Sequence, residues 1–306
     1  MATATTSSYP AAGSVPEPGI YRDVPAAVYH SWKACSNSLL SHLVTHTPAH
    51  LKWAQDNHEE ADALAFGEAF HASILEPDRF AREYAVAGQC EASKKSGDRC
   101  SNPGVLSSGG AWYCGVHKPA VIAPDGRKVI SADDMEMLRG FRAAVAATPK
   151  LRRIIKDRIE TELSIVWNDA ATGVLCRGRI DAIYKTMIVD LKTTRDASRR
   201  EFERAIFGYG YHRQIAFYSR GLAAHGIAAD LNTIAAFEKR APYLAAPYAI
   251  DDEALRAGDA QITPALERYA ECLATNQWPG YSPDIQTISL PKWALNQITP
   301  NDMEQA

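Results

Sequence analysis

Two adjacent apolar segments with charges inside them constrain the fold of this chain more than any other feature. Residues 174–184 and 187–192 are rich in aliphatic side chains and predict two strands joined by a two-residue turn. Charged residues are usually avoided inside such strands, yet Asp181, Asp190 and Lys192 all lie within them. These three side chains therefore need a structural or chemical explanation.

The predicted turn fixes the register of this hairpin. Asp181 then faces Asp190, and opposed residues of an antiparallel pair have Cβ atoms about 4.5–5.5 Å apart. Side chains alternate along a strand, so Lys192 lies on the same face as Asp190, with Arg179 opposite Lys192. The pairs expected nearer the turn are Tyr184–Met187, Ile183–Ile188 and Ala182–Val189. The other face is expected to be wholly apolar and to contain Ile180, Ala182, Val189 and Leu191.

Two directly opposed carboxylates destabilise a sheet unless something offsets their repulsion. One solution is a divalent cation held between them, because hard oxygen ligands suit magnesium or manganese. The other is an internal ion-pair cluster with Arg179 and Lys192. Spacing alone leaves both solutions open.

Helical patterns before and after the strands predict an α/β or α+β domain with a covered sheet. The predicted helices are residues 34–57 with a break at Pro48 and an N-cap at Ser36 or Asn37, 60–80 with a stop near Pro77, 131–155 with an N-cap at Ser131, 201–224 and 251–275. The predicted strands are residues 161–167, 174–184, 187–192, 231–238 and 243–250.

The composition limits the classes of function. The 306 residues are 46% hydrophobic and 23% charged, with a net charge of −3 and a pI of about 6.3. The chain lacks the basic excess of many nucleic-acid binders, which leaves room only for a local basic channel. No run approaches the roughly 20 apolar residues of a membrane helix. The N-terminus has no secretory pattern, and six cysteines predict no disulfide scaffold, so we expect an intracellular, reducing compartment.

Domain boundaries follow from local composition. Residues 1–18 are rich in small residues and proline and predict a disordered tail. Residues 296–306 predict a frayed C-terminus. One domain is expected over residues 19–295, interrupted by a polar, Gly/Ser-rich insertion over residues 88–119.

The insertion contains Cys90, Cys100, Cys114 and His117. Three thiolates and one imidazole can form a closed tetrahedral zinc site, and zinc would supply folding free energy that a segment poor in aliphatic residues lacks. The spacing between Cys114 and His117 is typical, whereas nine residues between Cys90 and Cys100 is long. The alternative is a set of scattered reduced cysteines in a flexible loop.

Five segments in order resemble the RecE-type phage exonucleases (exodeoxyribonuclease VIII), a branch of the PD-(D/E)xK nuclease superfamily. They are FGEAFHASILEPDRF, ETELSIVW, CRGRIDAI, IVDLKTT and YHRQIAFYSRG. The resemblance spans most of the chain outside the tail and the insertion. It implies an α/β fold with a PD-(D/E)xK nuclease core, in which helices flank a central mixed sheet.

The resemblance also implies roles for individual residues. His71, Asp181 and Asp190 would be ligands of Mg²⁺ or Mn²⁺, with the backbone carbonyl of Leu191 as a further ligand. Lys192 would orient or activate the attacking water and stabilise the charged transition state, as a compact ammonium can. For His71 the alternative is an ordinary core or surface histidine, although Gly67 one turn earlier leaves room on the same helix face.

Three further residues complete the implied site. Glu162 would be a metal ligand or an outer carboxylate, with Glu160 as its nearby competitor. Gln214 and Tyr218 would help to hold the metal site and the DNA strand. These two lie four residues apart and share a helix face, which is also compatible with a purely structural helix.

The function implied by the resemblance is Mg²⁺-dependent 5′→3′ exonuclease activity on linear duplex DNA ends, which leaves 3′ single strands for recombination. The implied partners are double-stranded DNA ends and a strand-annealing recombination protein, and the implied assembly is a homo-oligomeric ring. The implied setting is the bacterial cytoplasm, with a phage or its host as the source and no membrane. The alternatives are an endonuclease, a single-strand exonuclease, or a non-catalytic module that binds DNA ends or proteins.

Overall fold

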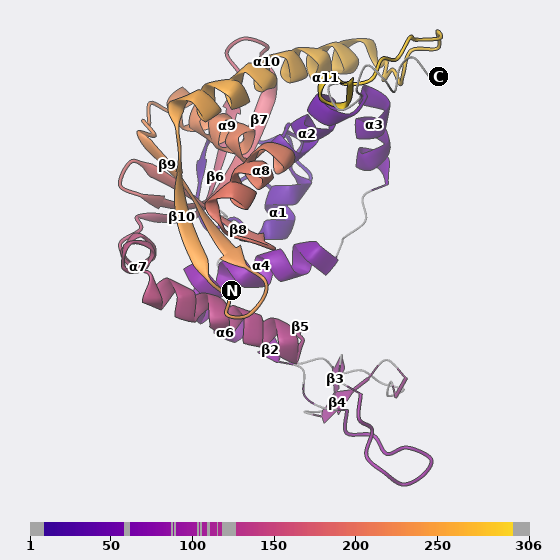
Figure 1. Cartoon of the computed structure of the whole chain (residues 1–306), viewed down its shortest axis with the longest axis vertical. Helices are drawn as coiled ribbons and strands as arrows, with labels where there is room; N and C mark the ends of the chain where they lie inside the picture. Colours follow the sequence, from indigo (N-terminus) through magenta and orange to yellow (C-terminus); the bar gives the residue numbers. More distant parts are fainter. Residues whose placement is uncertain are drawn as a thin grey trace, which may run out of the picture.

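The computed structural model describes residues 9–57, 62–86, 88, 90–102, 104, 106–108, 111–114, 116–117 and 127–295. Its centre is a six-stranded sheet with helices on both faces, and a small cysteine-rich lobe projects from one end (Figure 1). The predicted α/β class with a central mixed sheet flanked by helices is confirmed.

The central sheet has the strand order β1-β6-β7-β8-β9-β10. Its strands are β1 (Gly19–Tyr21), β6 (Glu160–Asn168), β7 (Leu175–Tyr184), β8 (Met187–Thr194), β9 (Leu231–Glu238) and β10 (Ala245–Ile250). Strands β8 and β9 pair in parallel, and the other neighbours pair antiparallel. A parallel pair requires a crossover connection, which α8 (Arg199–Tyr209) and α9 (Tyr211–Ala224) supply.

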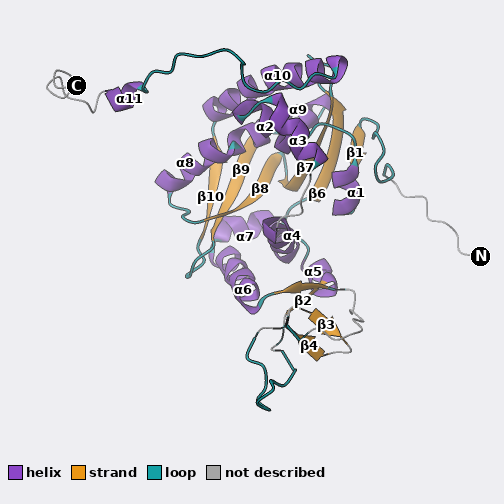
Figure 2. Cartoon of the chain, turned by 90° about the vertical axis from the view of Figure 1, so that its right-hand side faces the viewer, coloured by secondary structure: helices purple, strands orange, loops and turns teal. Residues whose placement is uncertain are grey.

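Two groups of helices cover the two faces of this sheet (Figure 2). The first group is α2 (Asn37–Thr45), α3 (Pro48–Asp56), α8, α9 and α10 (Asp252–Thr275), whose buried side chains form one core cluster with the sheet. The second group is α4 (Asp62–Leu75), α5 (Pro77–Glu83), α6 (Ala132–Ala147) and α7 (Pro149–Lys156), which form another cluster. Phe70, Phe141 and Phe237 join these helices to the sheet with ring centroids 5.1–5.3 Å apart.

Helix boundaries follow local capping chemistry. Ser36 and Ser131 accept hydrogen bonds from the N–H groups of Leu39 and Asp134, which confirms both predicted N-caps. The predicted stop near Pro77 is confirmed, since α4 ends at Leu75; the residues that follow form the separate helix α5, because proline fits the first turn of a helix. The predicted helix over residues 201–224 is likewise two helices, since Gly210 has φ 68° and separates α8 from α9.

Seven short elements were not predicted. Three of them are β1, α1 (Ala26–Ser31) and α11 (Lys292–Leu295), and the other four are short strands in and beside the insertion. Residues 9–18, expected within a disordered tail, are tied to α1: the Gly13 N–H donates to Ser31 Oγ at 2.8 Å, and Trp32 Nε1–H donates to the Pro10 carbonyl at 3.2 Å. Residues 1–8 and 296–306 lie outside the described part of the chain.

The β7–β8 hairpin has the predicted register. Tyr184 pairs with Met187, Ile183 with Ile188 and Ala182 with Val189, and Lys185 adopts φ 56° in the turn. The regular register ends at Ala182–Val189, so the expected pairing of Arg179 with Lys192 does not form. On the other side of β7, Arg179 pairs with Ser164 of β6.

The expected single apolar face of the hairpin is also wrong in part. Ile180, Ala182, Val189 and Leu191 are all buried, but Ile180 packs in the cluster that contains α9, whereas the other three pack in the cluster that contains α4. Glu162 of β6 lies between the paired positions next to Asp181 and has φ 49°. This irregularity interrupts the alternation of faces at the point where the charged residues lie.

The insertion forms a lobe apart from the central sheet. It contains β3 (Leu106–Ser108) paired antiparallel with β4 (Ala111–Tyr113), and its stem is a parallel pair of β2 (Tyr84–Val86) and β5 (Lys128–Ile130). Residues 118 and 119, at the end of the predicted insertion, lie outside the described residues. Within the part of the chain that the structure describes, none of the helices combines the length and hydropathy that a membrane span requires.

Close packing between α9 and the sheet makes Gly221 a sensitive position. A β-carbon there would lie 2.5 Å from Ile165 Cδ1 and 2.8 Å from the Trp167 ring. We expect Gly221→Ala to lower the free energy of unfolding by about 1–3 kcal/mol through overpacking. Gly208→Ala on α8 is the matched control, since its β-carbon would meet nothing within 4 Å, and it should add about 0.5–1 kcal/mol. Urea denaturation measures both, and equal effects would contradict the packing argument.

Candidate active site

Three side chains from three elements converge beside the irregular part of the sheet. His71 Nδ1 of α4 lies 3.3 Å from Glu162 Oε1 of β6 and 3.5 Å from Asp181 Oδ1 of β7. One ligand atom from each of the three lies within 4.8 Å of the others. The sequence placed His71 and Asp181 among the ligands and left Glu162 as a ligand or an outer carboxylate.

The local backbone positions both acids. Beyond Ala182 the hairpin ladder stops, and Asp181 Oδ2 accepts the N–H of Leu191 at 2.7 Å in place of a backbone carbonyl. The φ of 49° at Glu162 sets this residue out of the regular β6–β7 register. Glu160, the competitor considered for this role, forms an ion pair with Arg22 instead.

Asp190 and Lys192 form the second part of the site. Lys192 Nζ lies 2.7 Å from Asp190 Oδ2, and Asp190 is only 1% exposed. Among the described residues, Asp190 Oδ1 has no hydrogen-bond donor. A buried carboxylate oxygen without a donor carries a desolvation cost, which is a reason to look for a further partner.

Burial and mutual charge perturb the pKa values of the groups in the cluster. Burial, reinforced by the Asp190 carboxylate and opposed by the His71 imidazolium, raises the pKa of Asp181 to about 6. Burial lowers the pKa of His71, but Asp181 and Glu162 outweigh it and raise the pKa to about 9. Burial lowers the pKa of Lys192, whereas Asp190 and Asp181 raise it above its ordinary value.

These charges explain how the protein tolerates buried acids close together in the hairpin. In the protein alone, the His71 imidazolium and the Lys192 ammonium offset the acids, and Arg179 forms an ion pair with Glu162. That cluster is the ion-pair solution, with Arg179 on a different acid from the one expected. Because a histidine ligand must be neutral, a metal ion here would replace the His71 proton.

The donor set fits a hard divalent cation. Asp181 and Glu162 supply carboxylate oxygens and His71 supplies an imidazole. Asp190 lies outside this group of three, and its Oδ1 has no hydrogen-bond donor among the described residues. Oxygen ligands with one imidazole suit magnesium or manganese. Leu191 contacts Asp181 through its N–H, and the role of its carbonyl stays a prediction.

Gln214 and Tyr218 lie on α9, over the opposite wall of the site. Gln214 Nε2 donates to Tyr218 Oη at 2.8 Å, which links the two residues that share a helix face. The Tyr218 ring lies close to Gly178 of β7, where a β-carbon would come within 2.9 Å of it. Both residues line the same cavity as His71, Asp181 and Lys192, which places the predicted pair at the site.

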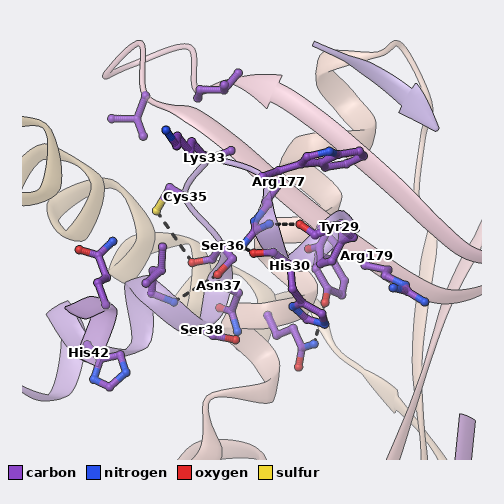
Figure 3. A pocket seen from close by; sticks show the side chains of 18 of the residues that line it. Tyr29, His30, Lys33, Cys35, Ser36, Asn37, Ser38, His42, Arg177 and Arg179 are labelled. Atoms are coloured by element: carbon purple, nitrogen blue, oxygen red, sulfur yellow. Dashed lines mark hydrogen bonds between the residues drawn. The ribbon is translucent and has the colours of Figure 1, made fainter. Parts of the chain in front are cut away.

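This cavity has a volume of about 1300 Å³ and extends to the segment that joins α1 to α2 (Figure 3). Arg177 donates to the carbonyls of Tyr29 and His30, and its guanidinium lies 4.9 Å from the centre of the Tyr29 ring. Arg179 lies 5.6 Å from the same ring. Tyr29 could not be predicted from the sequence as a residue of this cavity, because only the tertiary fold brings α1 against β7.

The lobe holds a second cluster, made of all four predicted ligands. Cys90, Cys100 and Cys114 are 0–3% exposed, and with His117 they place one ligand atom each within 4.8 Å of the others. Cys114 Sγ lies 3.3 Å from His117 Nδ1 and 4.0 Å from Cys100 Sγ. Cys90 Sγ lies 3.7 Å from His117 Nδ1.

Short backbone contacts bring these ligands together. Cys90 N–H donates to the Asn102 carbonyl at 3.0 Å and Cys100 N–H to the Ala92 carbonyl at 2.8 Å, so the long spacing between the two cysteines closes into a compact loop. Burial raises the pKa of Cys114, but hydrogen bonding with the backbone of His117 and Val116 and with the His117 ring outweighs burial and lowers the pKa to about 6. Such hydrogen bonds favour a thiolate over a thiol at this position.

Comparisons with known proteins agree with this fold. Residues 28–291 match the family described as "PDDEXK-like domain of unknown function (DUF3799)". A solved structure from Eubacterium rectale, named "Putative exonuclease", aligns over 90% of this chain and 98% of its own with 12% identity and a TM-score of 0.54. The structure of SSO0001 aligns over 42% of this chain and 60% of its own with 16% identity, but its TM-score of 0.25 supports no argument. No curated protein matches the chain significantly.

Proposed function

The chain belongs to the PDDEXK-like domain family (DUF3799), and from this premise we propose that it is a metal-dependent exonuclease that hydrolyses DNA from linear duplex ends. The observation that carries the proposal is the convergence of His71, Glu162 and Asp181 in one large cavity that Lys192 also lines, with Asp190 buried beneath as the ion-pair partner of Lys192. The likeness to a protein named as an exonuclease is compatible with this proposal and by itself concerns only the fold.

The chemistry follows from the residues. A divalent cation held by His71, Asp181 and Asp190, with Glu162 as ligand or outer carboxylate, would make water nucleophilic near neutral pH and offset the charge of the phosphate. Lys192 places its ammonium beside the attacked phosphate and stabilises the added negative charge. Gln214 and Tyr218 hold the strand against the site from α9.

The same cavity offers contacts for a DNA strand. Arg179 lines it, and its guanidinium can bind a phosphate when Glu162 turns to the metal. Ser36, Asn37 and Ser38 also line it, at the N-terminal end of α2. The Oδ1 atom of Asn37 is buried without a hydrogen-bond partner among the described residues. Such a local patch of polar and basic side chains can bind a DNA strand even though the chain as a whole is mildly acidic.

Digestion of matched DNA substrates tests the proposal. We expect linear duplex to be degraded in Mg²⁺ and preserved in EDTA, while closed circular duplex stays intact. Labels on the 5′ or the 3′ end report the polarity of digestion. The proposed 5′→3′ direction predicts early release of the 5′ label, while the strand with the 3′ terminus at that end persists as a single strand. Nicking of circles would indicate an endonuclease, and loss of single strands alone would indicate a single-strand exonuclease. Mg²⁺-independent binding without any cleavage would indicate a binding module.

Two parts of the proposal concern assembly. The resemblance to RecE-type enzymes suggests a homo-oligomeric ring, which would gather basic side chains around a central channel, and a strand-annealing protein as partner. Light scattering on the purified protein measures the mass of the assembly. A monomeric mass at the concentrations used in the digestion would contradict the proposed ring but would not contradict the proposed hydrolysis.

We also propose that Cys90, Cys100, Cys114 and His117 bind one structural zinc ion. Three thiolates and an imidazole that are buried and face one another fit a closed tetrahedral site. Among the described residues of the lobe, the apolar cluster around the three cysteines adds only the partly buried Ala92. Zinc would therefore contribute most of the free energy that keeps this lobe folded.

A further inference from the structure

A second, smaller groove lies next to the active-site lysine. It has a volume of about 730 Å³, and its lining includes two aromatic residues, Tyr209 and Tyr211, and three cations, Arg195, Lys239 and Arg240. None of these five residues belongs to the ligand set or the Gln-Tyr pair described above. The groove is formed where β8 ends, α8 passes into α9 and β9 ends.

A glycine between the two tyrosines builds the aromatic side of the groove. Gly210, with φ 68°, ends α8 and starts α9, so Tyr209 and Tyr211 flank a sharp turn instead of following one helix. Their rings stack with centroids 5.5 Å apart and an interplanar angle of 24°. Tyr209 remains 71% exposed, which leaves one ring face open to a ligand.

The inner tyrosine connects this groove to the active site. Lys192 Nζ lies 5.2 Å from the centre of the Tyr211 ring, and Lys192 also lines the main cavity. A chain that leaves the main cavity past Lys192 therefore meets Tyr211 first and Tyr209 next. The groove thus continues the path of a strand beyond the phosphate that Lys192 would face.

The charges of the groove are unbalanced. Of its two acids, Glu201 pairs with Arg204 at 2.8 Å, whereas Asp196 Oδ1 only accepts the Ser198 N–H at 2.7 Å and keeps its negative charge. Its three cations, Arg195, Lys239 and Arg240, are exposed and make no ion pair with a carboxylate of the described residues. The groove thus offers free positive charge beside an open aromatic face.

We propose that this groove binds the DNA strand next to the scissile phosphate, with a base stacked on Tyr209 and backbone phosphates held by Arg195, Lys239 and Arg240. The inference rests on the proposed nuclease function and names a second contact region for its substrate. Stacking on an aromatic ring together with phosphate contacts is the way single strands are bound without regard to sequence. Charge complementarity favours a nucleic acid over a second copy of this net acidic chain.

Oligonucleotide binding in a cleavage-deficient background tests the inference. In Asp190→Asn protein with Mg²⁺, we expect Tyr209→Ala to weaken binding of a 3′-overhang duplex by about 10-fold. Tyr209→Phe, which keeps the ring, should bind normally. Phe207→Ala is the matched control: this side chain is 77% exposed on the same helix but stacks on His212 and does not line the groove.

Two further readouts separate stacking from a general loss of structure. The fluorescence of a 2-aminopurine base in the strand next to the duplex end should be quenched equally by the parent protein and by Tyr209→Phe, because both keep an aromatic ring at this position. Tyr209→Ala should leave that fluorescence unquenched. Replacing Arg195 with glutamine should reduce the magnitude of the slope of the logarithm of the association constant against the logarithm of the salt concentration by about 0.7.

The outcomes distinguish this inference from the proposed function. If the wild type degrades DNA but Tyr209→Ala and Phe207→Ala bind the overhang as well as the parent, the groove is not a strand site. If Tyr209→Ala changes the mass of the assembly and leaves DNA affinity unchanged, the face contacts another copy and the inference is overturned. Failure of the wild type to cleave or bind any DNA would instead reject the nuclease proposal itself.

Discussion

Asp190→Asn should abolish DNA cleavage, with a loss of about three orders of magnitude in rate. The substitution keeps the shape of the side chain and removes the buried negative charge beside Lys192. A site that depends on a divalent cation loses several kcal/mol of transition-state stabilisation with such a ligand, and each 1.36 kcal/mol is a factor of about ten. Release of acid-soluble nucleotides from linear duplex measures the rate.

Metal binding provides a readout that does not depend on activity. A ligand that binds the folded state alone raises stability by about 2.7 kcal/mol at 100 times its dissociation constant. We therefore expect Mg²⁺ to raise the melting temperature of the wild type and to have little effect on Asp190→Asn. Asp230→Asn is the matched control, because it removes the same charge from an exposed residue just before β9 and should keep both activity and the Mg²⁺ response.

Specific results would contradict this assignment. Normal cleavage by folded Asp190→Asn would show that the carboxylate has no role in the reaction. An equal Mg²⁺ response in both proteins would place the cation elsewhere. If Asp190→Asn failed to fold, Asp181→Asn provides an independent test, since Asp181 belongs to the cluster of three that converges with His71.

The hairpin could be predicted from sequence because its information is local. A two-residue turn and the alternation of side chains fix three backbone pairs, and all three occur. The predicted register is wrong beyond the Ala182–Val189 pair, where Asp181 Oδ2 accepts the N–H of Leu191 and the backbone ladder ends. A side chain that replaces a backbone acceptor is not visible in a pattern of apolar and polar residues.

Long-range contacts account for the rest of the site. His71 lies 91 positions before Glu162 in the chain, and only the resemblance to a family, not periodicity, placed it among the ligands. The pairing of Arg179 with Glu162 depends on the register of β6, which no local signal defined. Tyr29 and the groove around Tyr209 require the packed fold, although Gly210 between two tyrosines is a helix-ending signal that could have been used.

Loss of zinc is the second large effect that we expect. Wild-type protein should contain about one zinc ion per chain, and Cys114→Ser should contain almost none. Structural zinc sites in small domains bind with apparent free energies of about 10–16 kcal/mol, so the ion should persist through purification only while the ligand set is complete. Elemental analysis measures the content, and Cys272→Ser is the control because Cys272 is buried in α10 away from the cluster.

Removal of the zinc ion should unfold the cysteine-rich lobe and leave the central sheet folded. Removal of zinc would take away the ion that offsets the burial of the thiolates of Cys90, Cys100 and Cys114, and we expect all three to react with a thiol reagent in the wild type after chelation. Limited proteolysis should then cut between β2 and β5, whereas the core around Phe217 and Phe70 has its own packed clusters and should resist. Zinc-free protein with protected cysteines would mean that the lobe packs without a metal, because burial and hydrogen bonds alone would then hold the four side chains in place.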